Sequence, residues 1–486
     1  MVDDSIPADK HNLALLAGLR TYPKAIFWSV AMSTSIIMEG YDTMLMGNFY
    51  GQSAFRRQYG MHVEGDTYEI SSSWQAGLSN ASTCGQLLGL LMAGYVSERF
   101  GFRMTMIFGL GVMIGLIFIP FFAPSLAVLC VGQVFLGIPL GLFQTTPVLY
   151  ATEILPVCLR AYLTVYVNVC WAFGHLIGAG ILRATATMDT QWAYRIPFAI
   201  QWICPLLLIP LLFFAPESPW WLVRRGRLEE VKAVLRSVVS NTDAEIDVDK
   251  FVALMVVTTE HERSVNASTS YAACLRGIDL RRTLIGIGIY CTQTLSRNPL
   301  RSYSTYFLQQ AGMPSTRSFD MTIIGYALAV AGGFVSWALL PILGRRPVYV
   351  YSLATMTLLL LLIGILGIPQ ATSSSPAYSN AIGALLIISS FLYNSGMGPL
   401  TNTLCSEIPS ALLRSKSVVL ARWTYSVSGV IAGTITPYQL DSTAWTKGRT
   451  TVEMDLLFER GVSMRRFGET EVDLVEGICG DEKRGV

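Results

Sequence analysis

Gly94-Tyr95-Val96-Ser97-Glu98-Arg99-Phe100-Gly101-Phe102-Arg103 is a short charged turn between two apolar stretches, each long enough to cross a bilayer. A similar turn, Leu343-Gly344-Arg345-Arg346, follows 243 residues later (344 minus 101) and again interrupts an apolar stretch. One pair of an acidic and a basic residue, Glu153 with Arg160, occurs again as Glu407 with Arg414. The offset between the two pairs is 254 residues (407 minus 153), similar to that between the turns. We infer that the chain is built from two related halves.

The composition is that of a membrane protein. Of the 486 residues, 52% are hydrophobic and only 14% are charged, and the mean hydropathy is +0.46. A lipid bilayer is therefore the expected surrounding, and the net charge of +2 is too small to indicate a nucleic-acid partner. The nine cysteines lack CxxC spacing, so we expect no disulfide framework, no metal site and no cofactor. Two related halves in a membrane protein are typical of transporters, which rock two bodies about a shared site.

The first half contains six apolar segments long enough to span a bilayer. Lys and Arg gather at alternate ends of these segments, which places the amino terminus in the cytosol. Residues 1–24 are polar and lack a cleavage site after a short apolar core, so we predict a cytosolic tail and an uncleaved first crossing. The six predicted crossings are 25–50, 73–97, 104–122, 125–152, 161–182 and 196–215.

The second half offers only five apolar segments, which makes eleven predicted crossings in all. The expected twelfth is absent, because about ten residues separate Tyr438 from Lys447, and ten helical residues reach roughly 15 Å, half of a ~30 Å hydrocarbon core. The five crossings are 283–310, 320–340, 348–368, 380–404 and 417–437. The predicted organisation is a cytosolic tail (1–24), a six-helix bundle (25–215), a cytosolic loop with a short amphipathic helix (216–282), a five-helix bundle (283–440) and a polar tail (441–486).

In order and spacing, the motifs of the chain resemble those of sugar porters of the major facilitator superfamily, and most of all those of the fungal α-glucoside (maltose-type) permeases. The resemblance extends from about residue 25 to residue 438 and implies an all-α membrane protein with the two-bundle major facilitator fold. It rests on the 94–103 turn, Pro216-Glu217-Ser218-Pro219-Trp220-Trp221-Leu222, Gly344-Arg345-Arg346, Ser406-Glu407-Ile408-Pro409 and Met38-Glu39-Gly40-Tyr41-Asp42-Thr43.

Charged residues at the predicted cytosolic helix ends are expected to act as a gate that holds the halves together. An exposed ion pair contributes only about 0 to 1 kcal/mol, which suits contacts that break in every transport cycle. The alternative is that these charges only set the orientation of the chain in the membrane. The candidates are Glu98, Arg99, Arg103, Glu153, Arg160, Glu217, Arg345, Arg346, Glu407 and Arg414.

Glu39 and Asp42 are the candidates for carrying a proton. They lie three residues apart in the first predicted crossing, hence on one helix face, and a carboxylate at the bilayer centre costs about 2.5 to 3.5 kcal/mol on insertion scales. Asp42 matches the coupling aspartate of the family, whereas Glu39 is an additional carboxylate. Bacterial proton-coupled members place an arginine opposite this aspartate, where this chain has Gln133. The alternative is a carboxylate pair that only hydrogen-bonds neighbouring helices.

The resemblance also implies a sugar site. Aligned on the family motifs, five residues of this chain fall at sugar-contacting positions of the fifth, seventh and tenth helices, and fewer aromatic residues surround them than in a hexose site. For each residue the alternative is a hydrogen bond between helices, and for His175 the two interpretations are equally supported. The five candidates are Asn168, His175, Gln293, Asn394 and Asn402.

We therefore predict a monomeric, multi-pass transporter of the plasma membrane that imports an α-glucoside such as maltose together with a proton. The alternatives are a hexose transporter and a non-transporting sugar receptor or inactive truncated paralogue, which the absent crossing favours. We do not expect an enzyme, because the sequence carries no nucleophile, phosphate loop or metal cluster of credible spacing.

Overall fold

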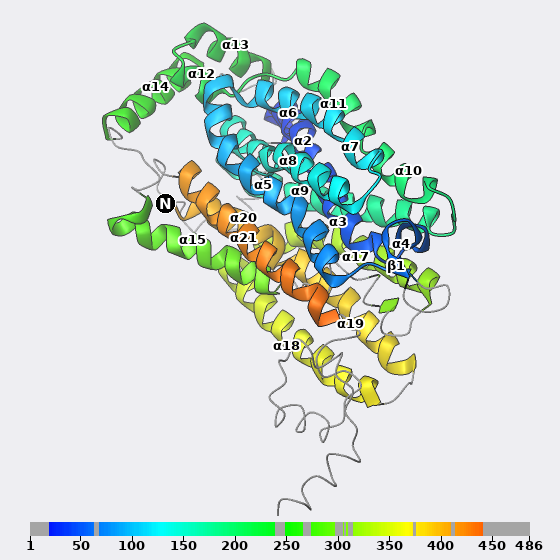
Figure 1. Ribbon diagram of the computed structural model, residues 1–486. Coiled ribbons are helices and arrows are strands. Elements are labelled where there is room, and N and C mark those ends of the chain that lie inside the picture. The colour runs from blue at the N-terminus through cyan, green and yellow to red at the C-terminus, as the bar shows by residue number, and fades with distance from the viewer. Residues whose placement is uncertain are drawn as a thin grey trace, which may run out of the picture.

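The computed structural model describes residues 19–62, 68–238, 248–265, 274–296, 305, 308–309, 314–372, 376–409 and 414–440, nearly all of which are helical (Figure 1). Most of the predicted amino-terminal tail and the whole predicted tail at 441–486 lie outside these residues. The prediction that the twelfth crossing is absent therefore also falls outside the described part of the chain.

The first half begins with a crossing made of two helices. α2 (Pro23–Ser33) and α3 (Ser35–Phe49) meet at Thr34, inside the crossing predicted at 25–50. The remaining elements of this half are α4 (Ser53–Tyr59), the antiparallel strands β1 (Met61–His62) and β2 (Tyr68–Glu69), α5 (Ser72–Phe100), α6 (Phe102–Leu116), α7 (Phe118–Phe121), α8 (Leu126–Ile154), α9 (Val157–Thr185), α10 (Trp192–Ile200) and α11 (Ile203–Phe213).

Three short helices follow in the polar connection, namely α12 (Pro219–Arg224), α13 (Leu228–Val238) and α14 (Val248–Val265). They lie together at one end of the molecule (Figure 1). The predicted amphipathic helix is α13, which buries Val231 and Val238 and exposes Glu229 and Glu230.

The second half also contains a broken crossing. The segment predicted at 380–404 consists of α19 (Pro376–Ser395) and α20 (Met397–Glu407), which are separated at Gly396. The other helices of this half are α15 (Gly277–Ser296), α17 (Ser315–Leu343), α18 (Arg345–Thr372) and α21 (Arg414–Leu440).

Helix packing repeats between the halves. In the first half α5 packs along α8 and α3 along α9, and in the second half α17 packs along α19 and α15 along α21. Further pairs join the halves, chiefly α5 with α21 and α9 with α17. Within both halves the pairs are the second crossing with the fourth and the first crossing with the fifth. The packing therefore agrees with the repeat inferred from the sequence.

The two glycine turns that reveal the repeat have the same backbone conformation. Gly101 joins α5 to α6 at φ 89°, and Gly344 joins α17 to α18 at φ 74°. Residues with a Cβ rarely adopt such positive φ values, which explains why glycine stands at both turns.

The outside of the bundle suits a bilayer. Large apolar side chains such as Phe108, Leu207 and Leu358 are exposed on it. Eight helices of the described residues are long and apolar enough to span a membrane. The predicted crossings at 25–50, 73–97 and 283–310 are not among them. The first contains Glu39 and Asp42, and the last lies only partly within the described residues. Eleven crossings therefore remain a prediction.

Candidate functional site

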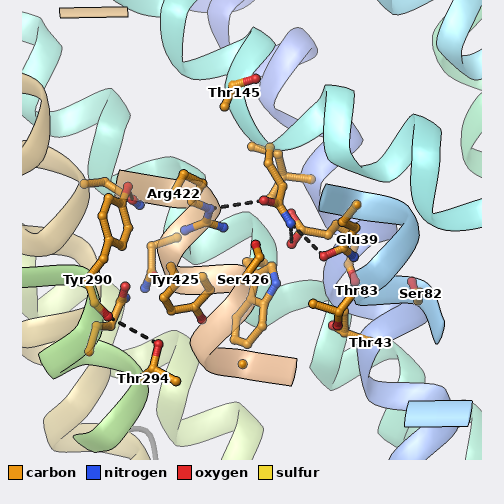
Figure 2. A pocket seen from close by; sticks show the side chains of 18 of the residues that line it. Glu39, Thr43, Ser82, Thr83, Thr145, Tyr290, Thr294, Arg422, Tyr425 and Ser426 are labelled. Carbon is orange, nitrogen blue, oxygen red and sulfur yellow. Dashed lines mark hydrogen bonds between the residues drawn. The ribbon is translucent and has the colours of Figure 1, made fainter. Parts of the chain in front are cut away.

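A cavity of about 220 Å³ lies between the two halves of the bundle. Its walls come from α3, α5, α8 and α9 of the first half and from α15, α19, α20 and α21 of the second. The lining combines amide and hydroxyl side chains with aromatic rings and a few charged groups (Figure 2). Such a site can bind a small molecule that carries many hydroxyl groups.

Glu39 and Asp42 both line this cavity from α3, with exposed fractions of 4% and 1%. The two oxygens of Asp42 accept hydrogen bonds from Ser82 Oγ at 2.9 Å and from Gln201 Nε2 at 3.0 Å. Gln133 is fully buried near Asp42. Neutral donors therefore bond both oxygens of Asp42.

Glu39 is connected to an arginine of the other half. Gln144 Nε2 on α8 donates to Glu39 Oε1 at 2.7 Å, and Arg422 Nε on α21 donates to Gln144 Oε1 at 3.1 Å (Figure 2). Neither Gln144 nor Arg422 is among the residues predicted from the sequence. The signal for Arg422 was available, because a basic residue inside the predicted crossing at 417–437 is rarely without a function.

Three of the five predicted sugar-contacting residues line the cavity, namely Asn168, Gln293 and Asn402. Gln293 Nε2 donates to the Tyr393 hydroxyl at 2.8 Å, and Asn402 Oδ1 accepts from the Tyr290 hydroxyl at 3.0 Å. Because each amide has one end held by a neighbour, its orientation in the cavity is fixed.

The other two predicted residues do not line this cavity. Asn394 is fully buried, donates to the Ser390 carbonyl at 2.8 Å and accepts from Asn168 Nδ2 at 3.0 Å. His175 is 4% exposed and packs against Trp171 and Tyr326. Asn394 thus bonds to another helix, whereas His175 contacts Trp171 of its own helix and Tyr326 of α17. A sugar contact of either residue stays a prediction.

Aromatic side chains contribute more to the walls than the sequence led us to expect. Trp171, Tyr290, Tyr393 and Tyr425 line the cavity. The Arg422 guanidinium lies 4.8 Å from the ring centre of Tyr425 and 5.7 Å from that of Tyr290. These contacts hold the arginine against the wall by cation–π attraction.

At the predicted cytosolic end, Glu217 caps a helix. Its carboxylate accepts from the backbone N–H of Phe102 at 2.9 Å and of Arg103 at 3.2 Å, at the start of α6. A carboxylate at a helix amino terminus stabilises the unpaired N–H groups and the helix dipole. Burial raises the pKa of the Glu217 carboxyl, while the backbone hydrogen bonds oppose that rise.

The other predicted gating charges of the first half make contacts within that half and the polar connection after it, or are exposed. Glu153 accepts from Arg224 at 2.7 Å and from the Ser218 hydroxyl. Arg160 Nε donates to the Leu155 carbonyl at 3.2 Å. Glu98 and Arg99 are exposed, and their backbone carbonyls accept hydrogen bonds from Arg225.

In the second half, Arg345 and Arg346 are exposed at the start of α18. The side chains of Glu407 and Arg414 lie outside the described part, so a gate between the halves at this end stays a prediction. At the opposite end an ion pair that was not predicted joins the halves, since Arg183 Nε on α9 lies 2.7 Å from Asp320 Oδ1 on α17.

Curated relatives share most of the length of the chain. The general alpha-glucoside permease of Saccharomyces cerevisiae is 38% identical over 498 residues, which cover 96% of this chain and 80% of the permease. A maltose permease of the same yeast is 38% identical over 507 residues, which cover 97% and 82%.

Solved structures share the fold. The proton:xylose symporter XylE bound to 6-bromo-6-deoxy-D-glucose matches with a TM-score of 0.71 at 19% identity, over 92% of this chain and 94% of that one. A partially occluded, inward-open conformation of XylE from E. coli matches with a TM-score of 0.68 at 18% identity, over 85% and 91%.

These matches confirm the predicted two-bundle fold, the multi-pass membrane location and the resemblance to yeast α-glucoside permeases. Residues 27–457 match the family described as sugar (and other) transporter. The chain belongs to this family of sugar transporters.

Proposed function

We propose that this chain is a secondary active transporter that imports an α-glucoside such as maltose together with a proton. The observation that carries the proposal is that Glu39 and Asp42 line the same cavity as the amides of Asn168, Gln293 and Asn402. Carboxyl groups that can exchange protons thus share one chamber with groups that can bind sugar.

The proton is expected to reside on Asp42, Glu39 or both. Burial favours the neutral form of a carboxyl group, and hydrogen bonds or a nearby cation favour the charged form. Asp42 has two neutral donors, whereas Glu39 has a donor that is itself bonded to Arg422. The two carboxyl groups thus differ in what stabilises their charge, and either one can release its proton when its surroundings change.

The sugar is expected to lie against the amides and the aromatic rings. Asn168, Gln293 and Asn402 offer both donors and acceptors, and Trp171 and Tyr425 offer apolar faces for a pyranose ring. The choice of an α-glucoside rests on the names of the yeast relatives, and the choice of proton coupling is supported by the name of the structural neighbour.

The position of the cavity suits alternating access. It lies between two halves with repeated packing, so rocking one half against the other would open it first to one side of the membrane and then to the other. We propose that the protein works as a monomer in the plasma membrane, because each chain provides both halves.

Uptake by the full chain in proteoliposomes tests the proposal. With an inward-directed proton gradient, labelled maltose is expected to accumulate about tenfold per unit of pH difference for one proton per sugar, since tenfold corresponds to about 1.4 kcal/mol. Asp42→Asn is expected to lose this accumulation. Uptake by Asp42→Asn that is undiminished and independent of pH would exclude this residue as the carrier.

Two results would favour another function. Maltose binding without uptake by the wild-type chain would indicate a sugar receptor or an inactive paralogue. Uptake of glucose that maltose does not compete with would indicate a hexose transporter.

A further inference from the structure

One buried amide nitrogen in the cavity has no hydrogen-bond partner among the described residues. Gln86 on α5 is 3% exposed and lines the cavity, and its Nε2 atom has no hydrogen-bond partner among the described residues. A buried N–H donor without a partner costs about 1 to 3 kcal/mol. Such a group beside a cavity is available to a ligand that enters it in place of water.

The chemistry of its neighbours fixes which end of Gln86 faces the cavity. A guanidinium group can only donate, so the Gln144 atom that meets Arg422 Nε at 3.1 Å has to be the oxygen. The Gln144 nitrogen therefore points at Glu39 Oε1, at 2.7 Å, and at Gln86, at 2.9 Å. The Gln86 atom that accepts from this nitrogen has to be its oxygen, which leaves both N–H groups of Gln86 free for a ligand.

Other unpaired atoms of the lining complement this donor. Thr145 Oγ1 on α8 and Gln293 Oε1 on α15 are also buried, line the cavity and have no partner among the described residues. The set thus comprises an amide donor, a hydroxyl that can donate or accept and an amide acceptor, contributed by both halves of the bundle. Sugar hydroxyl groups both donate and accept, so each of the three atoms can pair with a sugar hydroxyl group.

We propose that Gln86 is a further substrate-binding residue, whose amide N–H group donates to a hydroxyl group of the bound sugar. The proposal rests on the proposed function, since it names a contact in the same site. It adds a contact from α5 to the candidates on α9, α15 and α20. Gln144 holds both Gln86 and Glu39, so the same amide that orients the sugar donor also touches a candidate proton carrier.

The test compares Gln86→Met with a matched control, Gln75→Met. Gln75 lies on the same helix and is also buried, but it hydrogen-bonds the Ile70 carbonyl and does not line the cavity. Affinity for maltose and for a series of monodeoxy maltoses is measured by titration calorimetry on the purified full chain. We expect Gln86→Met to weaken maltose binding about tenfold, as for a lost hydrogen bond in a dry site, and Gln75→Met to leave it unchanged.

The deoxy sugars identify the contact. One deoxy maltose lacks the hydroxyl group that pairs with Gln86. The wild type is expected to bind this sugar about as weakly as Gln86→Met binds maltose. Gln86→Met is expected to bind this deoxy sugar and maltose with equal affinity. The proposal would be overturned if Gln86→Met reduced the affinity for every deoxy sugar by the same factor relative to the wild type. Gln86 would then act only by orienting Gln144. Unchanged maltose binding by Gln86→Met would overturn it as well.

Two precautions separate this result from other failures. If Gln86→Met does not give a folded protein, Gln86→Asn keeps the amide but withdraws it by one methylene group, and the same pattern across the deoxy sugars is expected. If the wild type binds no α-glucoside, the proposed function fails on the wild type alone. The comparison is then made with whichever hexose or pentose the wild type binds, and a wild type that binds no sugar overturns both proposals.

Discussion

Arg422 and Glu39 come from opposite halves of the chain and are joined by a single side chain. Gln144 accepts from Arg422 Nε at 3.1 Å and donates to Glu39 Oε1 at 2.7 Å. The guanidinium and the carboxyl group are therefore linked through one amide, which both of them polarise. Protonation of Glu39 weakens this link, so the charge on one half alters a contact with the other half.

Arg422→Gln is expected to abolish sugar accumulation driven by a proton gradient. Without the cation the ionised form of Glu39 loses its support, and the carboxyl keeps its proton through the cycle. The accumulation ratio of labelled maltose in proteoliposomes is expected to fall to about one, a tenfold loss or more for a gradient of one pH unit. Arg422→Lys keeps the charge but not the planar fork, so it is expected to retain only part of the activity.

The control for this variant is Arg236→Gln, since Arg236 is exposed on α13, away from the cavity. Accumulation by Arg422→Gln equal to that of Arg236→Gln would show that the link from Arg422 to Glu39 has no part in coupling.

Glu39→Gln is expected to separate exchange from accumulation. The new amide keeps an oxygen that can accept from Gln144, so the bonds that fix Gln86 and Arg422 are retained. Exchange of labelled for unlabelled maltose at equal concentrations is expected to persist, whereas accumulation against a gradient is lost because the side chain no longer titrates. Loss of both activities in a variant with an unchanged melting temperature would contradict a role in proton transfer alone.

The sequence predicted the fold better than it predicted the site. Apolar segments of membrane-spanning length and the paired glycine turns at Gly101 and Gly344 are local or repeated signals, so they can be read from one chain. The contact of Gln144 with Arg422 spans 278 residues (422 minus 144), and no spacing rule relates such distant positions. The charge of Arg422 within an apolar segment was visible, but its partner was not.

Asn168 lines the cavity and His175 does not, because the two residues lie at different positions along the axis of α9. The two residues are seven positions apart on α9, two turns, and so they share a face of the helix. Seven residues correspond to roughly 10 Å along the axis. His175 is therefore beyond the cavity, against Tyr326 of α17, and a sequence alignment contains no measure of where a cavity ends.

Removal of the Glu217 side chain is expected to destabilise the protein. Glu217→Ala deprives the first N–H groups of α6 of their acceptor, and loss of a helix cap costs about 1 kcal/mol. Glu217→Gln keeps one acceptor oxygen and is expected to lose less. Thermal unfolding of the purified protein measures both, with Glu260→Ala as the control because Glu260 is exposed on α14. Equal melting temperatures for Glu217→Ala and the control would contradict the capping role.

The pH dependence of stability is expected to differ between wild type and Glu217→Gln. Burial raises the pKa of the Glu217 carboxyl, so the folded protein binds this proton more tightly than the unfolded chain. The stabilisation is complete below the pKa of the unfolded chain, about 4.3, and it is lost as the pH rises through the higher pKa of the folded state. The melting temperature of the wild type should therefore fall relative to that of Glu217→Gln between about pH 4 and pH 7. A constant difference over this range would show that the carboxyl titrates alike in both states.

Gly433→Val is expected to hold the halves apart at the end predicted to face outside. A Cβ at Gly433 on α21 would lie 2.5 Å from Asn80 Oδ1 on α5, and Asn80 also donates to Thr434 at 2.8 Å across the same interface. Rotation of the Asn80 side chain would break its bond to Thr434, so the clash is relieved either by that loss or by separation of α5 from α21. Overpacking costs roughly 1 to 3 kcal/mol. Uptake is expected to fall, while a cysteine at cavity residue Ser79 becomes more reactive toward a thiol reagent added from outside. Gly111→Val is the control because Gly111 borders open space, and equal labelling of the two variants would mean that α5 and α21 do not separate when the outer side opens.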